Sequence, residues 1–501
     1  MLTNLFELLI LRVANRRGRS RPDPLDGQPA ATTRDGRVLI GHLIPDLGDI
    51  DASPVAATLT PEERLRHIYI LGATGTGKTN LVMRLIESDI ASERTFCVVD
   101  LRGDLTDRVL LHLARQTTPE TLGERLVLID LKVDDYTVGI NPLVGPGEPY
   151  ARAFHVLSVL RKQSDSWGVQ LEDTLRNVLV ALAEYGGSML DIEPILTRKE
   201  FRERVLASVT DPMVHGFFQR YEQLSDEKRM TWVLPVLNKV APFLAMPILR
   251  RTFGHREPLS IRELLDGKPG RVILVSLAID RTHQAAHLVG GLFVSMFQTA
   301  VMARAGIPEC ERIPVHLYID EFETMATDQF EVIVAEGRRF GLGLCLSHQN
   351  LSQLPTCLRH VLRNNVHAQF LFQTGAVDAA ELDAEVSTDT PKEVVRRLLI
   401  RQPVGEAFLI RRGQDSRRVR VLHCPDPVVD AASIQAIREH ALETHGRRAA
   451  DIDLELDGRE PHRGLPPCHE RQSLPPIDPD PTLDVHREVR HARKPGQFRP
   501  L

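Results

Sequence analysis

The strongest restriction on the fold of this chain comes from a glycine-rich loop between a strand pattern and a helix pattern. The apolar run HIYIL at 67–71 is followed by GATGTGKT at 72–79 and then by NLVMRLIESDI, whose apolar residues have helical spacing. Glycines let the backbone turn its N–H groups inward, and the positive end of the following helix attracts an anion. This order of strand, loop and helix is that of a phosphate-binding loop, so we expect ATP to bind here.

The residue types in this loop assign a role to each position. Lys78 supplies a positive charge to the β and γ phosphates, and the hydroxyl of Thr79 is placed to hold Mg²⁺. The residues expected to contact the nucleotide are Gly72, Ala73, Thr74, Gly75, Thr76, Gly77, Lys78, Thr79 and Asn80.

A pair of carboxylates follows a second apolar run, in PVHLYIDEFETM. Asp320 ends the predicted strand, where it can hold magnesium through the water shell of the ion, and Glu321 can act as the general base for the attacking water. Such a pair is a weak signal alone. Together with GATGTGKT it predicts a P-loop ATPase that binds and hydrolyses Mg-ATP.

Hydrolysis also needs a group that senses the γ phosphate and a cation for the transition state. Gln349 lies just beyond a predicted strand and could contact the γ phosphate or orient water, although an ordinary loop glutamine is the alternative. Arg338 and Arg339 precede that strand. Either could reach the ATP of a neighbouring subunit as an arginine finger, or both could belong to a solvated basic surface.

Short apolar, β-branched runs recur along the chain with helical stretches between them. This alternation predicts an α/β fold, a RecA-like P-loop NTPase core with a mainly parallel sheet covered on both faces. The expected strands are 67–71, 95–99, 125–129, 271–277, 315–319, 342–347, 367–373 and 406–410.

The region between the third and fourth of these strands contains helical patterns only, for example VQLEDTLRNVLVALAEYG at 169–186. We interpret it as an inserted all-helical domain; helices that simply cover the sheet are the alternative. From 424 onward the sequence patterns fade, apart from a helix near 430–445, and residues 461–501 with their nine prolines are expected to be disordered. The expected domains are 37–150 and 263–425 for the ATPase core, 151–262 for the insertion, and 426–501 for the C-terminal helix and tail.

The N-terminus contains an apolar stretch followed by arginines. Residues 1–17 are predicted to form an amphipathic helix, and 18–36 a Gly, Pro and Arg-rich linker. The helix could dock on protein or lie on an anionic membrane. No segment has the 18 or more apolar residues of a membrane-spanning helix, so we expect a cytoplasmic protein, either free or peripheral on the inner face of the cell membrane.

Charge and cysteine usage add two limits. The formal net charge is −5, so any contact with nucleic acid requires a local basic surface. The six cysteines are far apart and none has zinc-ligand spacing, which favours a reducing compartment. Cys468 and His469, with His462, lack the second ligand pair that a metal site in the tail would need.

Several short motifs together resemble those of the HerA/FtsK superfamily of hexameric motors, and most of all the type IV secretion coupling ATPases of conjugation. The resemblance spans about 37–425. The motifs are GATGTGKT at 72–79, DLRGD at 100–104, INPL at 140–143, YIDEF at 318–322 and EGRRFGLGLCLSHQNLSQL at 336–354.

This resemblance implies a hexameric ring in which Gln349 senses the γ phosphate and Arg338, rather than Arg339, is the finger acting on the neighbouring subunit. Asp100 could assist near the site or could simply cap its strand. Coupling proteins usually begin with two membrane-spanning helices, in whose place this chain has residues 1–14. Some soluble members of the superfamily are DNA motors that work with a separate nuclease or effector.

Three functions are therefore considered. The first is a homo-hexameric ATPase that translocates DNA through a central pore. The second is a motor for protein substrates in a secretion machine, and the third is a nucleotide switch that scaffolds a partner. A secretion channel, or a nuclease or other effector, is the expected protein partner.

Overall fold

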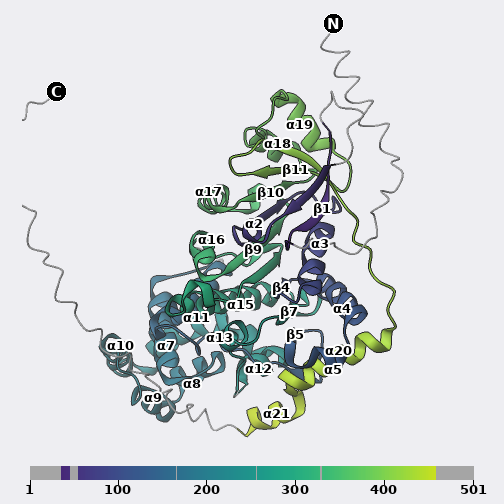
Figure 1. Ribbon diagram of the computed structural model, residues 1–501. Coiled ribbons are helices and arrows are strands. Elements are labelled where there is room, and N and C mark those ends of the chain that lie inside the picture. Colours follow the sequence, from purple (N-terminus) through teal and green to yellow (C-terminus); the bar gives the residue numbers. More distant parts are fainter. Residues whose placement is uncertain (1–34, 46–54, 165, 256, 328–329, 459–501) are drawn as a thin grey trace, which may run out of the picture. The chain divides into compact units, whose positions relative to one another are not determined.

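The computed structural model describes residues 35–45, 55–164, 166–255, 257–327 and 330–458 (Figure 1). The predicted N-terminal helix, nearly all of the linker and the proline-rich tail, including Cys468, lie outside the described residues.

A large mixed sheet forms the centre of the fold. Its strand order is β2-β1-β12-β11-β10-β3-β9-β8-β4-β7-β5. The seven strands from β10 to β5 are parallel to one another, whereas β11, β12, β1 and β2 each pair antiparallel with their neighbours. The strands are β1 (Val38–Leu43), β2 (Val55–Leu59), β3 (Ile68–Leu71), β4 (Thr95–Asp100), β5 (Leu126–Asp130), β7 (Val272–Ser276), β8 (Val315–Asp320), β9 (Leu342–His348), β10 (Ala368–Leu371), β11 (Glu406–Arg411) and β12 (Arg417–Val421).

All eight strands expected from the sequence are present, and the predicted α/β fold with a mainly parallel sheet is confirmed. Three strands of this sheet, β1, β2 and β12, were missed. β1 and β12 pair where Gly41 lies against the backbone of Arg420, and a Cβ at Gly41 would come within 2.0 Å of the carbonyl oxygen of Arg420. Glycine at this close approach and arginines on alternate positions of β12 obscure the apolar pattern from which strands are recognised.

Helices cover both faces of the sheet. The helices outside the insertion are α2 (Pro61–Leu65), α3 (Lys78–Ala91), α4 (Asp104–Gln116), α5 (Pro119–Leu122), α14 (Ile279–Thr282), α15 (Ala285–Met302), α16 (Phe330–Glu336), α17 (Thr356–Asn365), α18 (Ala376–Leu382), α19 (Lys392–Arg401), α20 (Ala431–His445) and α21 (Ala449–Asp457). Successive residues of a strand point to opposite faces, so Ile68 and Ile70 pack with α3 and α4, while Tyr69 and Leu71 join the core that contains α15.

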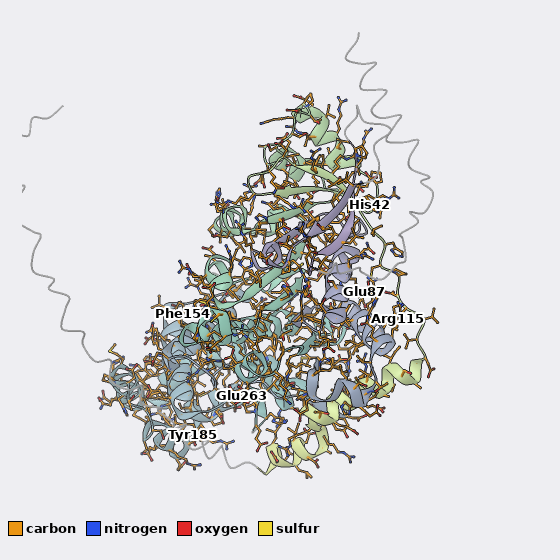
Figure 2. The ribbon with its side chains drawn as sticks, in the orientation of Figure 1. His42, Glu87, Arg115, Phe154, Tyr185 and Glu263 are labelled. Atoms are coloured by element: carbon orange, nitrogen blue, oxygen red, sulfur yellow. The ribbon has the colours of Figure 1, made fainter. Side chains whose placement is uncertain are left out.

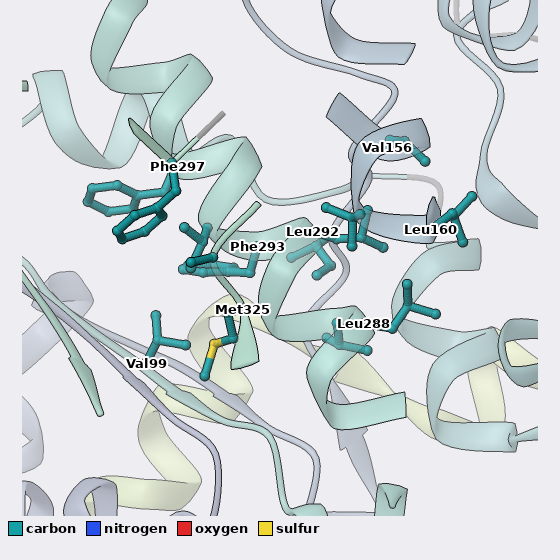
Figure 3. Packing of buried hydrophobic residues seen from close by; sticks show 14 of the residues in the cluster. Val99, Val156, Leu160, Leu288, Leu292, Phe293, Phe297 and Met325 are labelled. Atoms are coloured by element: carbon teal, nitrogen blue, oxygen red, sulfur yellow. The ribbon is translucent and has the colours of Figure 1, made fainter. Parts of the chain in front are cut away.

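α15 is apolar over its whole circumference because it lies between two layers. One face meets the sheet, and the other meets α6 (Pro149–Lys162), where Leu288 and Leu292 lie near Val156 and Leu160 (Figure 3). Contrary to the sequence expectation, Ala285–Gly306 is long and apolar enough to cross a membrane, but 72% of that window is buried within the fold. A core helix buried on all sides accounts for this composition.

Between β5 and β7 the chain forms α6, α7 (Val169–Tyr185), α8 (Ile192–Thr197), α9 (Lys199–Leu206), α10 (Pro212–Glu222), α11 (Asp226–Ala245), α12 (Pro247–Gly254) and α13 (Ile261–Asp266). The helix expected at 169–186 is therefore present, and Gly186 ends it with a left-handed backbone, φ 79°. The apolar core of these helices is continuous with the core on the α15 face of the sheet. Both sequence interpretations thus describe part of the arrangement: α6 covers α15, and the later helices form a cluster beyond it.

After residue 424 the chain forms more secondary structure than the sequence predicted. The expected helix near 430–445 is α20, which packs on β5 and α4. Beyond it, β13 (Arg447–Arg448) pairs with β6 (Tyr136–Thr137), and α21 contacts α12 through the ion pair of Arg251 with Asp453 at 2.7 Å. These partners are distant in sequence, so a local pattern could not reveal them.

Candidate active site

The glycine-rich loop connects β3 to α3 at the carboxyl ends of the parallel strands. Gly77 caps α3 with φ 113°, and a Cβ there would lie 3.1 Å from the Cα of Gly405. The N–H of Gly405 in turn donates to the carbonyl of Thr76 at 2.9 Å. Position 77 therefore requires glycine for two reasons: its positive φ, and the close approach of the backbone at Gly405.

Lys78 is the first residue of α3 and is 8% exposed. Its ammonium donates to the carbonyls of Gly72 at 2.7 Å and Ala73 at 3.1 Å. Burial lowers the pKa of Lys78, and the nearby carboxylates of Asp320 and Glu321 oppose that effect. The charge is thus held between the loop and the carboxylates, where phosphate oxygens fit its donor capacity. Thr79, one residue on, is exposed.

Asn80 has a different environment from the rest of the predicted nucleotide-binding set. Its Nδ2 donates to the carbonyl of Leu422 at 2.8 Å, and its Oδ1 accepts from the N–H of Cys424 at 2.7 Å. The side chain therefore fastens the segment after β12 to the start of α3. The backbone N–H of Asn80 and the second N–H of its Nδ2 remain as donors for a phosphate.

Asp320 and Glu321 end β8 as predicted. Ser347 on the adjacent β9 donates to Oδ1 of Asp320, and burial raises the pKa of Asp320. Glu321 has a left-handed backbone, φ 51° and ψ 44°, which turns the chain sharply after the strand. Asp320 therefore faces β9, while Glu321 reaches toward the residues that follow β9.

Gln349 joins the three predicted motifs. Its Nε2 donates to Oε1 of Glu321 at 2.9 Å, and its Oε1 accepts from the hydroxyl of Thr74 at 3.1 Å. The amide thus lies between the candidate general base and the phosphate-binding loop. A γ phosphate and an attacking water would have to lie in this region.

Arg102 also approaches Glu321 and was not singled out from the sequence. Its Nη2 lies 3.6 Å from Oε1 of Glu321, and its side chain is 64% exposed. Asp100 shapes the loop that carries it, because its two carboxylate oxygens accept the N–H groups of Arg102 at 3.0 Å and Thr106 at 2.9 Å. These contacts are those expected of a residue that caps the end of its strand, which was one of the two roles considered for Asp100. In the sequence, Arg102 could have been singled out only as part of the motif DLRGD, which follows a predicted strand.

Arg338 is not brought to the site of its own chain. It lies with Arg339 in the short helix Gly337–Phe340, which precedes β9, whereas the carbonyl of His348 at the other end of β9 accepts the N–H of Gly72 at 3.3 Å. Seven residues of strand separate these ends by roughly 20 Å. Both arginines are exposed, and Arg339 pairs with Glu336 at 2.8 Å.

Helix α6 contacts the loop that follows Glu321. The ammonium of Lys162 donates to the carbonyl of Glu323 at 2.7 Å and to that of Ala326, and Gln163 donates to the carbonyl of Thr324 at 3.2 Å. Burial raises the pKa of Glu323 to about 7. The helical insertion thus holds the backbone of the loop that carries the candidate base.

Lys162→Ala is expected to lower the kcat of ATP hydrolysis by about 10- to 100-fold, because the loop after Glu321 loses the donor that fixes it and the base is misplaced. The KM for ATP should change little, since the glycine-rich loop is untouched. Steady-state kinetics measure both constants. Lys199→Ala, in an exposed position on α9, is the matched control; equal losses in the two variants would contradict a specific role for Lys162.

Comparison with known proteins places this arrangement in a class of P-loop ATPases. The family model described as "Helicase HerA, central domain" matches residues 38–143. The type 4 coupling protein DotL of Legionella pneumophila is 23% identical over 351 residues, which cover 57% of this chain and 44% of DotL. The DNA double-strand break repair helicase HerA of Sulfolobus acidocaldarius is 22% identical over 371 residues, covering 69% of this chain and 64% of that protein.

Two solved structures share the fold. The plasmid coupling protein TrwB in complex with ADP and Mg²⁺ matches with a TM-score of 0.55 at 15% identity, over 81% of this chain and 99% of TrwB. VirB4 of Thermoanaerobacter pseudethanolicus matches with a TM-score of 0.51 at 13% identity, over 79% of this chain and 97% of VirB4. Residues 38–143 thus match the central domain of a HerA-type P-loop ATPase, and the chain shares its fold with the coupling protein TrwB and with VirB4. The chain spans less than two thirds of the length of each of the two curated relatives.

Proposed function

We propose that this chain is an ATP-hydrolysing motor that translocates DNA as a homo-hexameric ring. The observation that carries the proposal is the contact of Gln349 with both Glu321 and Thr74, because it unites the phosphate-binding loop, the candidate base and the candidate sensor in one place. A nucleotide-binding site without hydrolysis has no need for a carboxylate held beside the γ-phosphate position.

In the proposed mechanism Lys78 and the glycine-rich loop bind the phosphates of ATP. Thr79 and Asp320 are placed to hold Mg²⁺, which when bound neutralises charge on the β and γ phosphates. Glu321 takes the proton of the attacking water, and Gln349 orients that water through its amide. The amide oxygen of Gln349 accepts from Thr74, so loss of the γ phosphate would change the contacts of Gln349 at the end of β9. The sheet could transmit that conformational change.

The ring is supported by the position of Arg338. Arg338 lies just before β9, at the end of that strand opposite to its own phosphate-binding loop, so an arginine finger at this position would act on the nucleotide of another subunit. A heterologous interface that closes into a ring places each arginine beside the next site.

DNA as the substrate is supported by the relatives, of which one is named a DNA repair helicase and another a plasmid coupling protein. A secretion channel, or a nuclease or effector, is the proposed protein partner. The proposed location is the cytoplasm or the inner face of the cell membrane, with residues 1–17 contacting lipid or protein.

A DNA motor should hydrolyse ATP faster when double- or single-stranded DNA is added. This stimulation should weaken steeply with salt and depend little on sequence, because a translocase contacts phosphates and must accept every base. ATPase rates with each DNA, together with particle size, measure this. The Glu321→Gln variant controls for contaminating ATPases.

Other outcomes separate the alternatives. Hydrolysis that DNA leaves unchanged but a secreted protein stimulates would favour a protein motor. Very slow turnover with every addition would favour a nucleotide switch.

A further inference from the structure

Three potential metal ligands that the proposed hydrolysis does not use meet in the interior of the fold. Glu87, labelled in Figure 2, belongs to α3, His112 belongs to α4, and Cys424 lies in the segment after β12. All three side chains are buried, and their ligand atoms lie within 4.8 Å of one another. The three residues are far apart in the sequence, so a search for short metal-binding motifs could not have found the cluster.

His112 is the unusual member. It is 1% exposed, and neither ring nitrogen has a hydrogen-bond partner among the described residues. Its Nδ1 lies 3.5 Å from Oε1 of Glu87. A buried imidazole without a partner costs free energy, so its direction toward a carboxylate and a thiol indicates that another atom belongs between them.

The donor set and its spacing fit zinc. Zn²⁺ takes sulfur, imidazole nitrogen and carboxylate oxygen at 2.0–2.3 Å in a tetrahedron, whose ligand atoms are then roughly 3.3–3.8 Å apart. Here Nδ1 of His112 lies 3.5 Å from Oε1 of Glu87, and the thiol of Cys424 donates to Oε2 of Glu87 at 3.4 Å. One ligand atom from each residue lies within 4.8 Å of the other two, so a small inward shift would bring them to the spacing of zinc ligands. Magnesium is a poor alternative, because it prefers oxygen ligands and keeps its waters.

We propose that Glu87, His112 and Cys424 hold one Zn²⁺ ion, with water as the fourth ligand of the tetrahedron. The protein ligands would be the thiolate, the neutral imidazole and the carboxylate, and the proton of the thiol leaves to solvent when the metal binds. The two anionic ligands balance the charge of the ion, so the buried site is neutral overall.

Burial and the neighbouring Glu87 raise the pKa of Cys424 to about 12, and Arg84 and Arg108 oppose this effect, so metal binding has to displace the proton of the thiol. A bound dication removes both penalties, because it replaces the lost hydration of the sulfur and separates the two anionic groups.

The ion would fasten the segment after β12 to the two helices that follow the phosphate-binding loop and β4. Weaker contacts already make this link, since Asn80 binds Leu422 and Cys424, and Arg108 pairs with Asp426 at 2.6 Å. The zinc would therefore stabilise the fold around α3 rather than take part in hydrolysis.

The full chain, purified from zinc-supplemented cells and washed in excess Mg²⁺, should contain one equivalent of zinc per chain by plasma mass spectrometry. Cys424→Ser should lose that equivalent, whereas Cys310→Ser, which removes an exposed thiol elsewhere, should retain it. Chelation of the wild type should lower its melting temperature, and Co²⁺ added to the chelated protein should give a sulfur-to-cobalt charge-transfer band.

The cobalt band depends on the wild-type chain alone, so it tests the site even if Cys424→Ser folds poorly. Absence of both zinc and the cobalt band in the wild type would overturn the proposal. Zinc retained in full by well-folded Cys424→Ser would do so as well. These readouts are independent of DNA, so failure of the motor proposal would leave them unchanged.

Discussion

Glu321→Gln is expected to bind ATP almost normally yet hydrolyse it about 10²- to 10⁴-fold more slowly, because an amide cannot accept the proton of the attacking water. The substitution preserves the shape of the side chain and can retain a hydrogen bond to Gln349. Binding of a fluorescent ATP analogue and single-turnover hydrolysis measure the two effects separately.

Lys78→Ala is the contrasting variant. It removes the charge that meets the β and γ phosphates, so nucleotide binding itself should be lost. The two phenotypes must differ. Hydrolysis by Glu321→Gln at close to the wild-type rate would show that another group is the base.

Arg338→Ala should also bind ATP almost normally, since Lys78, Thr79 and the glycine-rich loop remain. Its hydrolysis should fall by about 10³-fold or more if the arginine completes the site of a neighbouring subunit. The exposed guanidinium has no ion pair or side-chain hydrogen bond among the described residues, so its removal should leave stability nearly unchanged. Arg339→Ala is the matched control.

Mixing the inactive variants tests whether this arginine acts between subunits. A Lys78→Ala chain keeps Arg338, and an Arg338→Ala chain keeps its phosphate-binding loop, so mixed rings contain some interfaces with both parts intact. Activity should therefore partly return. Co-assembled mixtures that stay inactive, or a loss confined to Arg339→Ala, would reject Arg338 as the finger.

The parts of the fold that the sequence predicted are those with strong local patterns. The glycine-rich loop and the eight apolar strands were recognisable because a period-2 or continuous apolar run depends only on neighbouring residues. The approach of Gln349 to Glu321 could also be expected, since the carboxyl ends of adjacent parallel strands meet at one edge.

The missed features depend on partners distant in the chain. β12 alternates valine with arginine and becomes a strand through its pairing with β1 and β11, and α21 is held by contacts to α12. Lys162 was not singled out from the sequence, and only the folded chain brings its ammonium to the loop after Glu321. Side-chain roles set by tertiary contacts of this kind leave no local trace.

The left-handed backbone of Glu321 lowers the stability of the fold at a residue that is proposed to take part in catalysis. A non-glycine residue in this region costs of order 1–3 kcal/mol, and the surrounding strands must hold it there. Glycine would adopt the same turn without that strain, but it has no carboxylate. Selection for thermal resistance alone would therefore favour glycine at this position, whereas the proposed role of Glu321 as general base would require the strained glutamate.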